Sequence, residues 1–368
     1  MSRNAGKRDE RAQKERSHKG GGRRPAPGKR VTLKDLATYL DVSVATVSRA
    51  LSGSPQADAL APETRARVER AADKLNYRPN YLAQSLRGKR TYSVGVLVPE
   101  ISEGYAAGVM SGVEGCLREE GYFYLMVSHR SQADHLTKSL DLLRDRGAEG
   151  FIVIAAEPER SPGVPTVVVS GHRPMSGLTN VVIDHDAAAR LALEHLRALG
   201  HHRIAFFRGR PGNIDADDRW RAIGAAAESM GIRIDSRLVM QLQGEAYGEA
   251  FSPDGGYQEG YTYGERLLRR GVGFSALFAF NDISALGAMC AFQDQGLQVP
   301  GDVSVLGFDD IGSAPFHRPS LSTIRQPLRQ MGILAAETLM ARLKGSDVKD
   351  VLVVQPELRV RRSTGRVS

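Results

Sequence analysis

The sequence predicts an α/β protein in which a three-helix helix-turn-helix module and a hinge helix precede two doubly wound parallel-sheet lobes. Two observations lead to this fold class. Residues 31–77 carry a helical pattern of apolar side chains, whereas after residue 89 short apolar runs such as YSVGVLV and GFIVIA alternate with helical stretches. Strands that alternate with helices form βαβ units and hence parallel sheets. About eight such units exceed the usual size of one sheet, so we expect two lobes.

The positive charge of the chain is concentrated at its N-terminus. The net charge is +8 overall, made up of +8 in residues 1–30, +4 in residues 31–90 and −4 in the remainder. Such asymmetry indicates that a polyanion binds at one end of the chain and a different ligand at the other. Residues 1–29 are polar and lack apolar periodicity, so we expect a disordered basic tail, for which a purely solubilising role is the alternative.

Nothing in the composition indicates a membrane or an oxidising compartment. No apolar run approaches the ~20 residues that a membrane helix requires, and the first 30 residues contain no apolar stretch typical of a secretory signal. The two cysteines, Cys116 and Cys290, lie far apart in apolar helix-like segments, which predicts buried free thiols. We therefore expect a cytoplasmic protein with no membrane partner.

Residues 31–53, VTLKDLATYLDVSVATVSRALSG, predict two short helices joined by a tight turn. Thr32 and Asp35 are spaced like a capping box, and Ser43 is a favoured N-cap for the second helix. A third helix is expected to begin near Pro62, because proline is favoured in the first helical turn. Three helices with so short a turn fit the major groove of DNA, although a small helical bundle with no nucleic-acid role has the same pattern.

Two strings make the DNA-binding interpretation more specific. VSVATVSRAL (residues 42–51), followed by LNYRPN (residues 75–80), resembles the DNA-binding module of the lactose-repressor/galactose-repressor family. The likeness extends from Val31 to about residue 365. It implies a transcriptional repressor that binds a pseudo-palindromic DNA operator as a homodimer and responds to a small-molecule effector, most simply a carbohydrate. The large domain would then have the fold of periplasmic binding proteins.

The resemblance and the change in sequence texture divide the chain into four parts. These are the basic tail (1–29), a helix-turn-helix DNA-binding domain (30–79), a hinge helix with its linker (80–90) and a ligand-sensing core (91–365). Within the core, we expect the first lobe at about 91–184 and 327–350, and the second at about 185–326 and 351–365.

The same resemblance implies which residues contact DNA. Val44 and Ala45 would meet base edges in the major groove, and Arg49 would reach a base or a phosphate. The hydroxyl residues of the module would hold phosphates and set the register; these are Thr32, Ser43, Thr46 and Ser48. Because Val44 and Ala45 are small and apolar, they can read only thymine methyl groups or groove shape.

A short segment after Pro79 resembles the hinge helix of the family. Asn80 can cap this helix, and Ala83 and Leu86 share one face of it. The resemblance implies that Leu86 wedges into the central base step of the minor groove, with Ala83 in the same groove. A plain linker with a buried leucine is the alternative.

Ligand residues of the large domain are carried over by position. Asp309 would accept two sugar hydroxyl groups, and Asn281 would offer a donor and an acceptor. Arg219 would reach the same ligand from the second lobe. The remaining positions are Tyr105 at the end of the first strand, Phe251 as a stacking aromatic, and Gln326 at the crossing back to the first lobe. Capping of the next helix is the alternative for Asp309, and core packing is the alternative for Phe251.

The sequence also departs from the family pattern. The first strand ends in EISEGYA (100–106) instead of an Asn-Pro motif with two aromatics, so Glu103 adds a charge near the ligand. The effector is therefore open between a sugar and a non-sugar co-repressor such as a purine or a protein partner. A stand-alone ligand-binding protein is the other alternative.

Motifs for catalysis are missing from the sequence. It contains no G-x-S-x-G elbow and no phosphate-binding loop, and the pair His201-His202 lacks further ligands for a metal. We therefore expect no enzyme activity, no cofactor and no metal.

Overall fold

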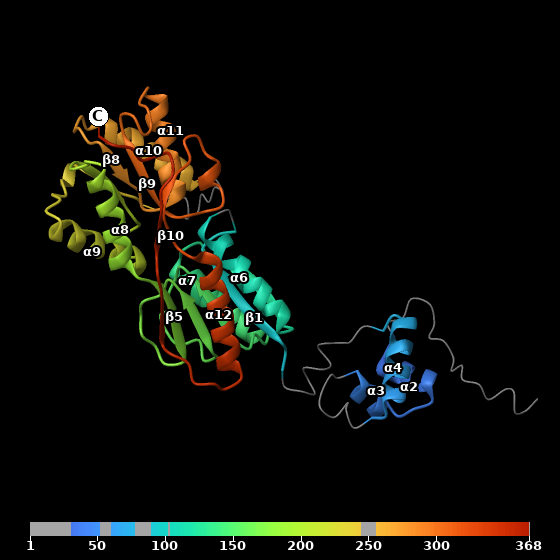
Figure 1. Cartoon of the computed structure of the whole chain (residues 1–368). Coiled ribbons are helices and arrows are strands. Elements are labelled where there is room, and N and C mark those ends of the chain that lie inside the picture. The colour runs from blue at the N-terminus through green and yellow to red at the C-terminus, as the bar shows by residue number, and fades with distance from the viewer. Residues whose placement is uncertain (1–30, 52–59, 78–89, 102–103, 244–254, 368) are drawn as a thin grey trace, which may run out of the picture. The chain divides into compact units, whose positions relative to one another are not determined.

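A computed structural model describes residues 31–51, 60–77, 90–101, 104–243, 255–367. It divides into two compact units, Met1–Arg90 and Thr91–Ser368 (Figure 1). Each unit is considered by itself.

The N-terminal unit contains the three helices that the sequence predicts: α2 (Leu33–Leu40), α3 (Val44–Ala50) and α4 (Pro62–Lys74). Both Thr32 and Asp35 contribute to a capping box at the start of α2, which satisfies backbone N–H groups that a helix start leaves unpaired. Fully buried side chains from all three helices meet in one core; they are Leu36, Val47 and Val68.

The first lobe of the large unit is a six-stranded sheet in the order β11-β5-β4-β3-β1-β2. Its strands are β1 (Ser93–Val98), β2 (Phe123–Ser128), β3 (Phe151–Ile154), β4 (Thr166–Val169), β5 (Leu178–Ile183) and β11 (Val351–Val354), and every pairing is parallel. Helices α6 (Tyr105–Glu119), α7 (Ala133–Asp145) and α12 (Leu328–Leu343) belong to this lobe.

The second lobe repeats this architecture in the order β12-β10-β9-β8-β6-β7. Its strands are β6 (Ile204–Arg208), β7 (Val239–Gln241), β8 (Ala276–Phe278), β9 (Ser304–Asp309), β10 (Ser322–Arg325) and β12 (Glu357–Arg359). Only β12 is antiparallel to its neighbour among these described strands. The helices are α8 (His185–Ala198), α9 (Ile214–Ser229), α10 (Gly255–Arg269) and α11 (Asp282–Asp294), with 3-10 turns η2 (Ser236–Leu238) and η4 (Ala314–Phe316).

The chain passes between the lobes three times, after β5, after β10 and after β11 (Figure 1). The last crossing corrects the expected boundary: residues 351–354 were assigned to the second lobe, but they form β11 beside β5 in the first. Pro356 explains the difference. Because proline lacks an N–H and interrupts a strand, the run VLVVQPELR splits into β11 and β12, which join different sheets.

Burial follows the position of each strand in its sheet. The inner strands β3, β4, β5 and β9 are buried along their whole length, as the continuous apolar runs predict. The edge strands differ, since Phe123 of β2 is 66% exposed and Val353 of β11 is 56% exposed. Among the described residues, no helix is both long and apolar enough to cross a membrane.

The prediction of two buried thiols is wrong. Cys116 on α6 is partly buried and Cys290 on α11 is exposed, and both are free. Helix α11 is buried at most of its positions, which explains its apolar sequence, but position 290 points away from the residues that cover it.

Helices α6 and α12 of the first lobe form a close pair. Helices α6 and α12 approach so closely that a Cβ atom at Gly112 would lie 2.0 Å from the carbonyl oxygen of Arg329, and one at Gly332 equally close to that of Val109. Side chains larger than hydrogen would force these helices apart.

Candidate functional sites

The exposed face of α3 is the candidate DNA-reading surface. Ala45 and Arg49 are exposed there, and Thr46 and Ser48 are partly exposed. Val44 is different, because it packs partly against the three-helix core. Contacts of these residues with DNA remain predictions, in which Ala45 and Arg49 are the most accessible.

Two of the expected phosphate contacts already have a structural role. The Thr32 hydroxyl donates to Asp35 Oδ2 at 2.7 Å, and Ser43 Oγ accepts from the backbone N–H of Thr46 at 3.0 Å. Both side chains therefore cap helices: Thr32 caps the start of α2, and Ser43 caps α3 at the turn between the two helices. Any phosphate would have to share these hydroxyl groups.

Several predicted residues lie outside the described part of the chain. They are Asn80, Ala83 and Leu86 of the expected hinge helix, together with Glu103 and Phe251.

The other candidate site is a cleft between the two lobes of the large unit. Both sheets have the strand order of a doubly wound fold, in which ligands bind beyond the carboxyl ends of the strands where the order reverses. A cavity of about 110 Å³ lies there. Five of the predicted ligand residues line it together: Tyr105, Arg219, Asn281, Asp309 and Gln326.

A second hollow of about 230 Å³ continues this cavity. The two share six lining residues from both lobes, namely Ser131, Ala155, Ser170, Arg210, Asn213 and Asp215. Arg210 of the second lobe also donates to the backbone oxygen of Ser131 of the first, at 3.0 Å. The cleft is thus a two-compartment space whose walls come from both lobes.

Arg219 is held rigidly at the cleft. It is 6% exposed, donates to the backbone oxygen of Phe280 at 2.7 Å and to Asp215 Oδ2 at 2.9 Å, and lies over the ring of Phe308 at 3.7 Å. Its Nε has no hydrogen-bond partner. The guanidinium also lines the cavity, and because it carries five N–H groups it can donate to a ligand there as well as to these two acceptors.

Asp309 lies opposite, at the carboxyl end of β9. It adopts a φ of 116°, a conformation rare for a residue with a side chain, and accepts from Gln326 Nε2 at 2.7 Å. Burial raises the pKa of Asp309 to about 7, although Arg219 and Gln326 oppose the shift. The 3-10 turn that follows, η4, has Ser313 at its N-cap position and no side-chain cap, so the capping alternative for Asp309 finds no support.

The remaining predicted residues each have a structural partner as well. Asn281 Oδ1 accepts from the N–H of Ser284 at 2.9 Å and caps α11, which leaves its amide nitrogen for a ligand. The hydroxyl of Tyr105 bonds to Ser170, and burial raises the pKa of Tyr105. Tyr105 is therefore a neutral hydroxyl at physiological pH.

Sequence reasoning missed Asp215, Arg210, Asn213 and the histidines beside them. Asp215 lies four residues before Arg219, so the two share one helix face, and this spacing was the available signal. His172 and His185 had no such signal, because a loop of the first lobe brings His172 to α9.

A larger hollow of about 690 Å³ lies beside α6 and the start of α12. It shares only Gln326 with the cavity between the lobes and contains none of the other predicted ligand residues. The smaller cleft is therefore the better candidate for a specific ligand, since convergent buried polar groups determine specificity.

The metal candidates differ from the pair considered in the sequence. Both ring nitrogens of His201 are hydrogen-bonded, to Ser275 and to the backbone of Gly365, so it is a structural residue. Within the described residues, ligand atoms of His172, His185 and Asp215 lie within 4.8 Å of one another. The guanidinium of Arg219 on the second oxygen of Asp215 opposes a bound cation there.

Comparisons with known proteins match both units of the chain. A family model described as bacterial regulatory proteins, lacI family, matches residues 32–80, and one for a periplasmic binding protein-like domain matches residues 193–364. The chain is 30% identical to the HTH-type transcriptional regulator DegA of Bacillus subtilis over 91% of its length and 98% of that protein. It is 30% identical to the transcriptional repressor PurR of Haemophilus influenzae, covering 90% and 98%, and 31% identical to the transcriptional regulator GalR of Escherichia coli, covering 90% and 94%.

Two solved structures extend this comparison to the fold. The Lac repressor dimer bound to operator and the anti-inducer ONPF superposes with a TM-score of 0.79 at 26% identity, over 92% of this chain and 100% of that one. The complex of the transcriptional regulator CelR with cellobiose superposes with a TM-score of 0.64 at 28% identity, over 91% and 100%.

Proposed function

This chain belongs to the lacI family of bacterial regulatory proteins, which are DNA-binding transcriptional regulators, and we propose that it is a repressor controlled by a small molecule in the cleft between its lobes. The observation that carries the proposal is the convergence of Arg219, Asn281 and Asp309 on one cavity in a chain that also has a capped helix-turn-helix. A ligand acts on such a protein through its different affinities for the open and closed lobes.

A sugar or sugar derivative is the first candidate effector. Each sugar hydroxyl both donates and accepts, and the cavity offers the Arg219 guanidinium as donor, the Asp309 carboxylate as acceptor and the Asn281 amide. A structural neighbour of this chain is a complex with cellobiose. Two joined compartments provide space for more than one ring.

A nucleobase such as a purine is the second candidate. The observation that favours it is the presence of two aromatic rings, Tyr105 and Phe280, in the lining of the cavity. A planar base can stack on aromatic rings while the amide of Gln326 and the carboxyl of Asp309 bond to its edge.

The working form is proposed to be a homodimer on a pseudo-palindromic operator. One recognition helix of seven residues covers only a few base pairs, so two-fold pairing is needed for affinity and register. The structural neighbour with the highest TM-score quoted above is a repressor dimer bound to operator.

We also propose that the protein binds its ligands without catalysing a reaction, and that it acts in the cytoplasm, where the DNA lies. The relatives quoted above are transcriptional regulators. The cleft groups Arg219, Asp309 and Gln326 hold one another in fixed hydrogen bonds or charge contacts, as expected for recognition of a ligand.

Two measurements test the proposal. Genomic DNA fragments selected by the purified full chain, then footprinted, should show a two-fold symmetric site. Melting temperatures are then measured with a panel of sugars and nucleobases, because a ligand that binds the native state raises the melting temperature. A shift with sugars supports the first candidate, a shift with nucleobases alone replaces it with the second, and failure to recover a symmetric site even with metabolite extract contradicts the regulator.

Replacement of Arg49 by alanine is expected to weaken binding to the selected operator by roughly 1–3 kcal/mol and to change non-specific binding little. The reason is that an exposed guanidinium on α3 can bond to a base edge. Fluorescence anisotropy on operator and random duplexes measures both affinities. Arg65→Ala on α4, which removes a side chain that is 42% exposed, is the matched control. An equal loss on both duplexes would assign Arg49 to a phosphate instead.

A further inference from the structure

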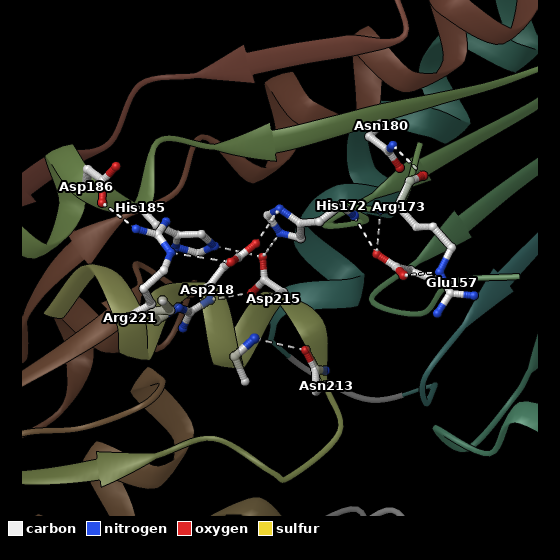
Figure 2. A network of polar contacts seen from close by, with 12 residues as sticks. Glu157, His172, Arg173, Asn180, His185, Asp186, Asn213, Asp215, Asp218 and Arg221 are labelled. Atoms are coloured by element: carbon white, nitrogen blue, oxygen red, sulfur yellow. Dashed lines mark hydrogen bonds and ion pairs between the residues drawn. The ribbon is translucent and has the colours of Figure 1, made fainter. Parts of the chain in front are cut away.

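A histidine of the first lobe contacts two carboxylates of the second. His172 lies in the loop between β4 and β5, and its ring reaches helix α9 (Figure 2). There His172 Nε2 is 3.1 Å from Asp215 Oδ1, and His172 Nδ1 is 3.1 Å from Asp218 Oδ2. These contacts join the lobes next to the proposed effector cavity, which Asp215 lines.

The geometry favours a protonated ring. His172 Nε2 is hydrogen-bonded to Asp215 Oδ1, and because a carboxylate only accepts, this nitrogen carries a hydrogen. Nδ1 lies at ion-pair distance from Asp218 Oδ2, so the second carboxylate also stabilises a positive charge on the ring. We therefore infer that the ring is an imidazolium.

Asp215 connects His172 to Arg219, which lines the cavity. Its Oδ1 accepts from His172 and from His185 Nε2 at 3.0 Å, while its Oδ2 accepts from Arg219 at 2.9 Å. Asp215 and Arg219 are 8% and 6% exposed, so this chain of charges is shielded from solvent. The position of Arg219 in the cavity thus depends on the groups that hold Asp215.

We propose that protonated His172 is an interlobe clasp, a positioning residue that favours the closed cleft and holds Asp215 and Arg219 in place for the effector. The proposal rests on the proposed function in one respect, since it assumes that the cavity takes a small molecule. It adds a regulatory property, namely that closure of the lobes takes up a proton.

The charged groups around the ring support this assignment. Glu157 accepts from the backbone N–H groups of His172 and Arg173, and the ring of His185 stacks on that of His172 at 5.7 Å. Arg221 forms ion pairs with Asp218 at 3.6 Å and with Asp186 at 3.5 Å. Burial lowers the pKa of His172, but the hydrogen bond to Asp215 and the charges of Asp215, Asp218 and Glu157 outweigh it, so the pKa is raised.

The direction of the pH effect follows from this shift. With the lobes apart, His172 loses the two carboxylates and its pKa returns toward the ordinary value of about 6.5. The closed form binds the proton more tightly, so its advantage is full below that ordinary value and is lost as the pH rises through the raised pKa. The closed form is therefore favoured at pH 6 over pH 8.5.

A metal ion among His172, His185 and Asp215 is the competing explanation of the same cluster. Asp215 already has a cationic partner in Arg219, and a dication beside that guanidinium would be repelled. The imidazolium carries one positive charge where the metal ion carries two, so it satisfies the same carboxylates with less repulsion from Arg219.

The first test is an NMR titration of the histidine ring protons in the full chain, in which His172→Gln identifies the His172 signal. We expect a pKa above 6.5 that falls toward 6.5 in Asp218→Asn and does not move in His135→Gln, a change at an exposed histidine on α7. A His172 pKa at or below 6.5, or one that Asp218→Asn leaves unchanged, would overturn the proposal.

The second test measures closure without effector or DNA. Spin labels on the native exposed Cys290 of the second lobe and on Lys138→Cys of the first, in a Cys116→Ser background, report the distance between the lobes. We expect the closed fraction to fall about threefold or more from pH 6 to pH 8.5. In His172→Gln it should be low, and the pH dependence that remains should be no more than that of Asp309, whose pKa of about 7 lies in the same range; Asp218→Asn is the second variant.

The outcomes separate the clasp from the proposed function. The clasp would be contradicted if the distance between the labels did not change with pH, or if His172→Gln left it unchanged. The effector proposal would then still stand. A closed fraction that appears with ZnCl₂ and disappears with EDTA would replace the proton with a metal. Failure of every ligand to bind would contradict the effector cavity while the pH-dependent clasp still stood.

Discussion

Replacement of Arg219 by methionine is expected to abolish the response to effector, with affinity for the effector reduced on the order of 100-fold or more. The guanidinium is the buried donor of the cavity, and its loss removes one of the three side chains that bond to Asp215, beside His172 and His185. Breaking a buried ion pair by removing one partner costs about 3–5 kcal/mol. The variant should therefore unfold at lower urea concentration, and an effector that shifts the melting temperature of the natural protein should shift it no longer.

Arg233→Met is the matched control, because Arg233 is an exposed arginine of the same lobe. It should retain stability and the effector response. Operator affinity without effector, measured by anisotropy, should stay close to that of the natural protein in both variants, provided the measurement is made below the unfolding transition of Arg219→Met. An effector response that survives in Arg219→Met would remove this residue from the ligand site.

Replacement of Asp309 by asparagine is expected to stabilise the unliganded protein above pH 7 while weakening the effector. Burial raises the pKa of Asp309 to about 7, so the folded state binds this proton more tightly than the unfolded chain. Stability then falls as the pH rises from the ordinary carboxyl value of about 4 to about 7, because the ionised group must stay buried. Each unit of pKa corresponds to about 1.4 kcal/mol, so a gain on the order of 1–3 kcal/mol is expected at pH 8.

Urea unfolding from pH 5 to pH 8 measures this gain. The natural protein should lose stability across this range more steeply than Asp309→Asn, and the two should converge toward pH 5. Asp302→Asn, in the loop before β9, controls for removal of an exposed carboxylate of the same lobe. If the free energy of unfolding fell equally steeply with pH in the two proteins, ionisation of Asp309 would not destabilise the folded state. The assignment of Asp309 as a strained, buried ligand carboxyl would then fail.

At Arg219 and Asp309, ligand binding and folding stability oppose each other. Asp309 at a φ of 116° and the partly satisfied Arg219 are arrangements that a protein selected for stability alone would avoid. A ligand whose hydroxyls bond to both would relieve the cost of burying them. Such sites are where binding and stability oppose each other.

Local sequence patterns were enough to predict the helices of the N-terminal unit. The capping box at Thr32, the N-cap at Ser43 and the helix start at Pro62 all depend on neighbours within a few residues, and the structure has all three. The alternation of strands and helices likewise predicted two parallel-sheet lobes, since a fully buried strand must be apolar on both faces.

Positions that depend on long-range pairing were harder to predict. The sequence placed residues 351–354 in the wrong lobe, because an apolar run shows that it is a strand but not which sheet edge it joins. Cys290 was expected to be buried for a similar reason: an apolar helix suggests burial without showing which side is covered.

The candidate site shows the same division. The sequence by itself, through its resemblance to a family, brought Arg219, Asn281, Asp309, Gln326 and Tyr105 into one predicted pocket, and the structure places them around one cavity. Only the tertiary structure brought His172 to Asp215 and Asp218, from a loop some forty residues away in the other lobe. Hydrogen bonds and ion pairs act over a few ångströms, so a contact between distant segments leaves no periodicity in the sequence and is decided only when the lobes pack.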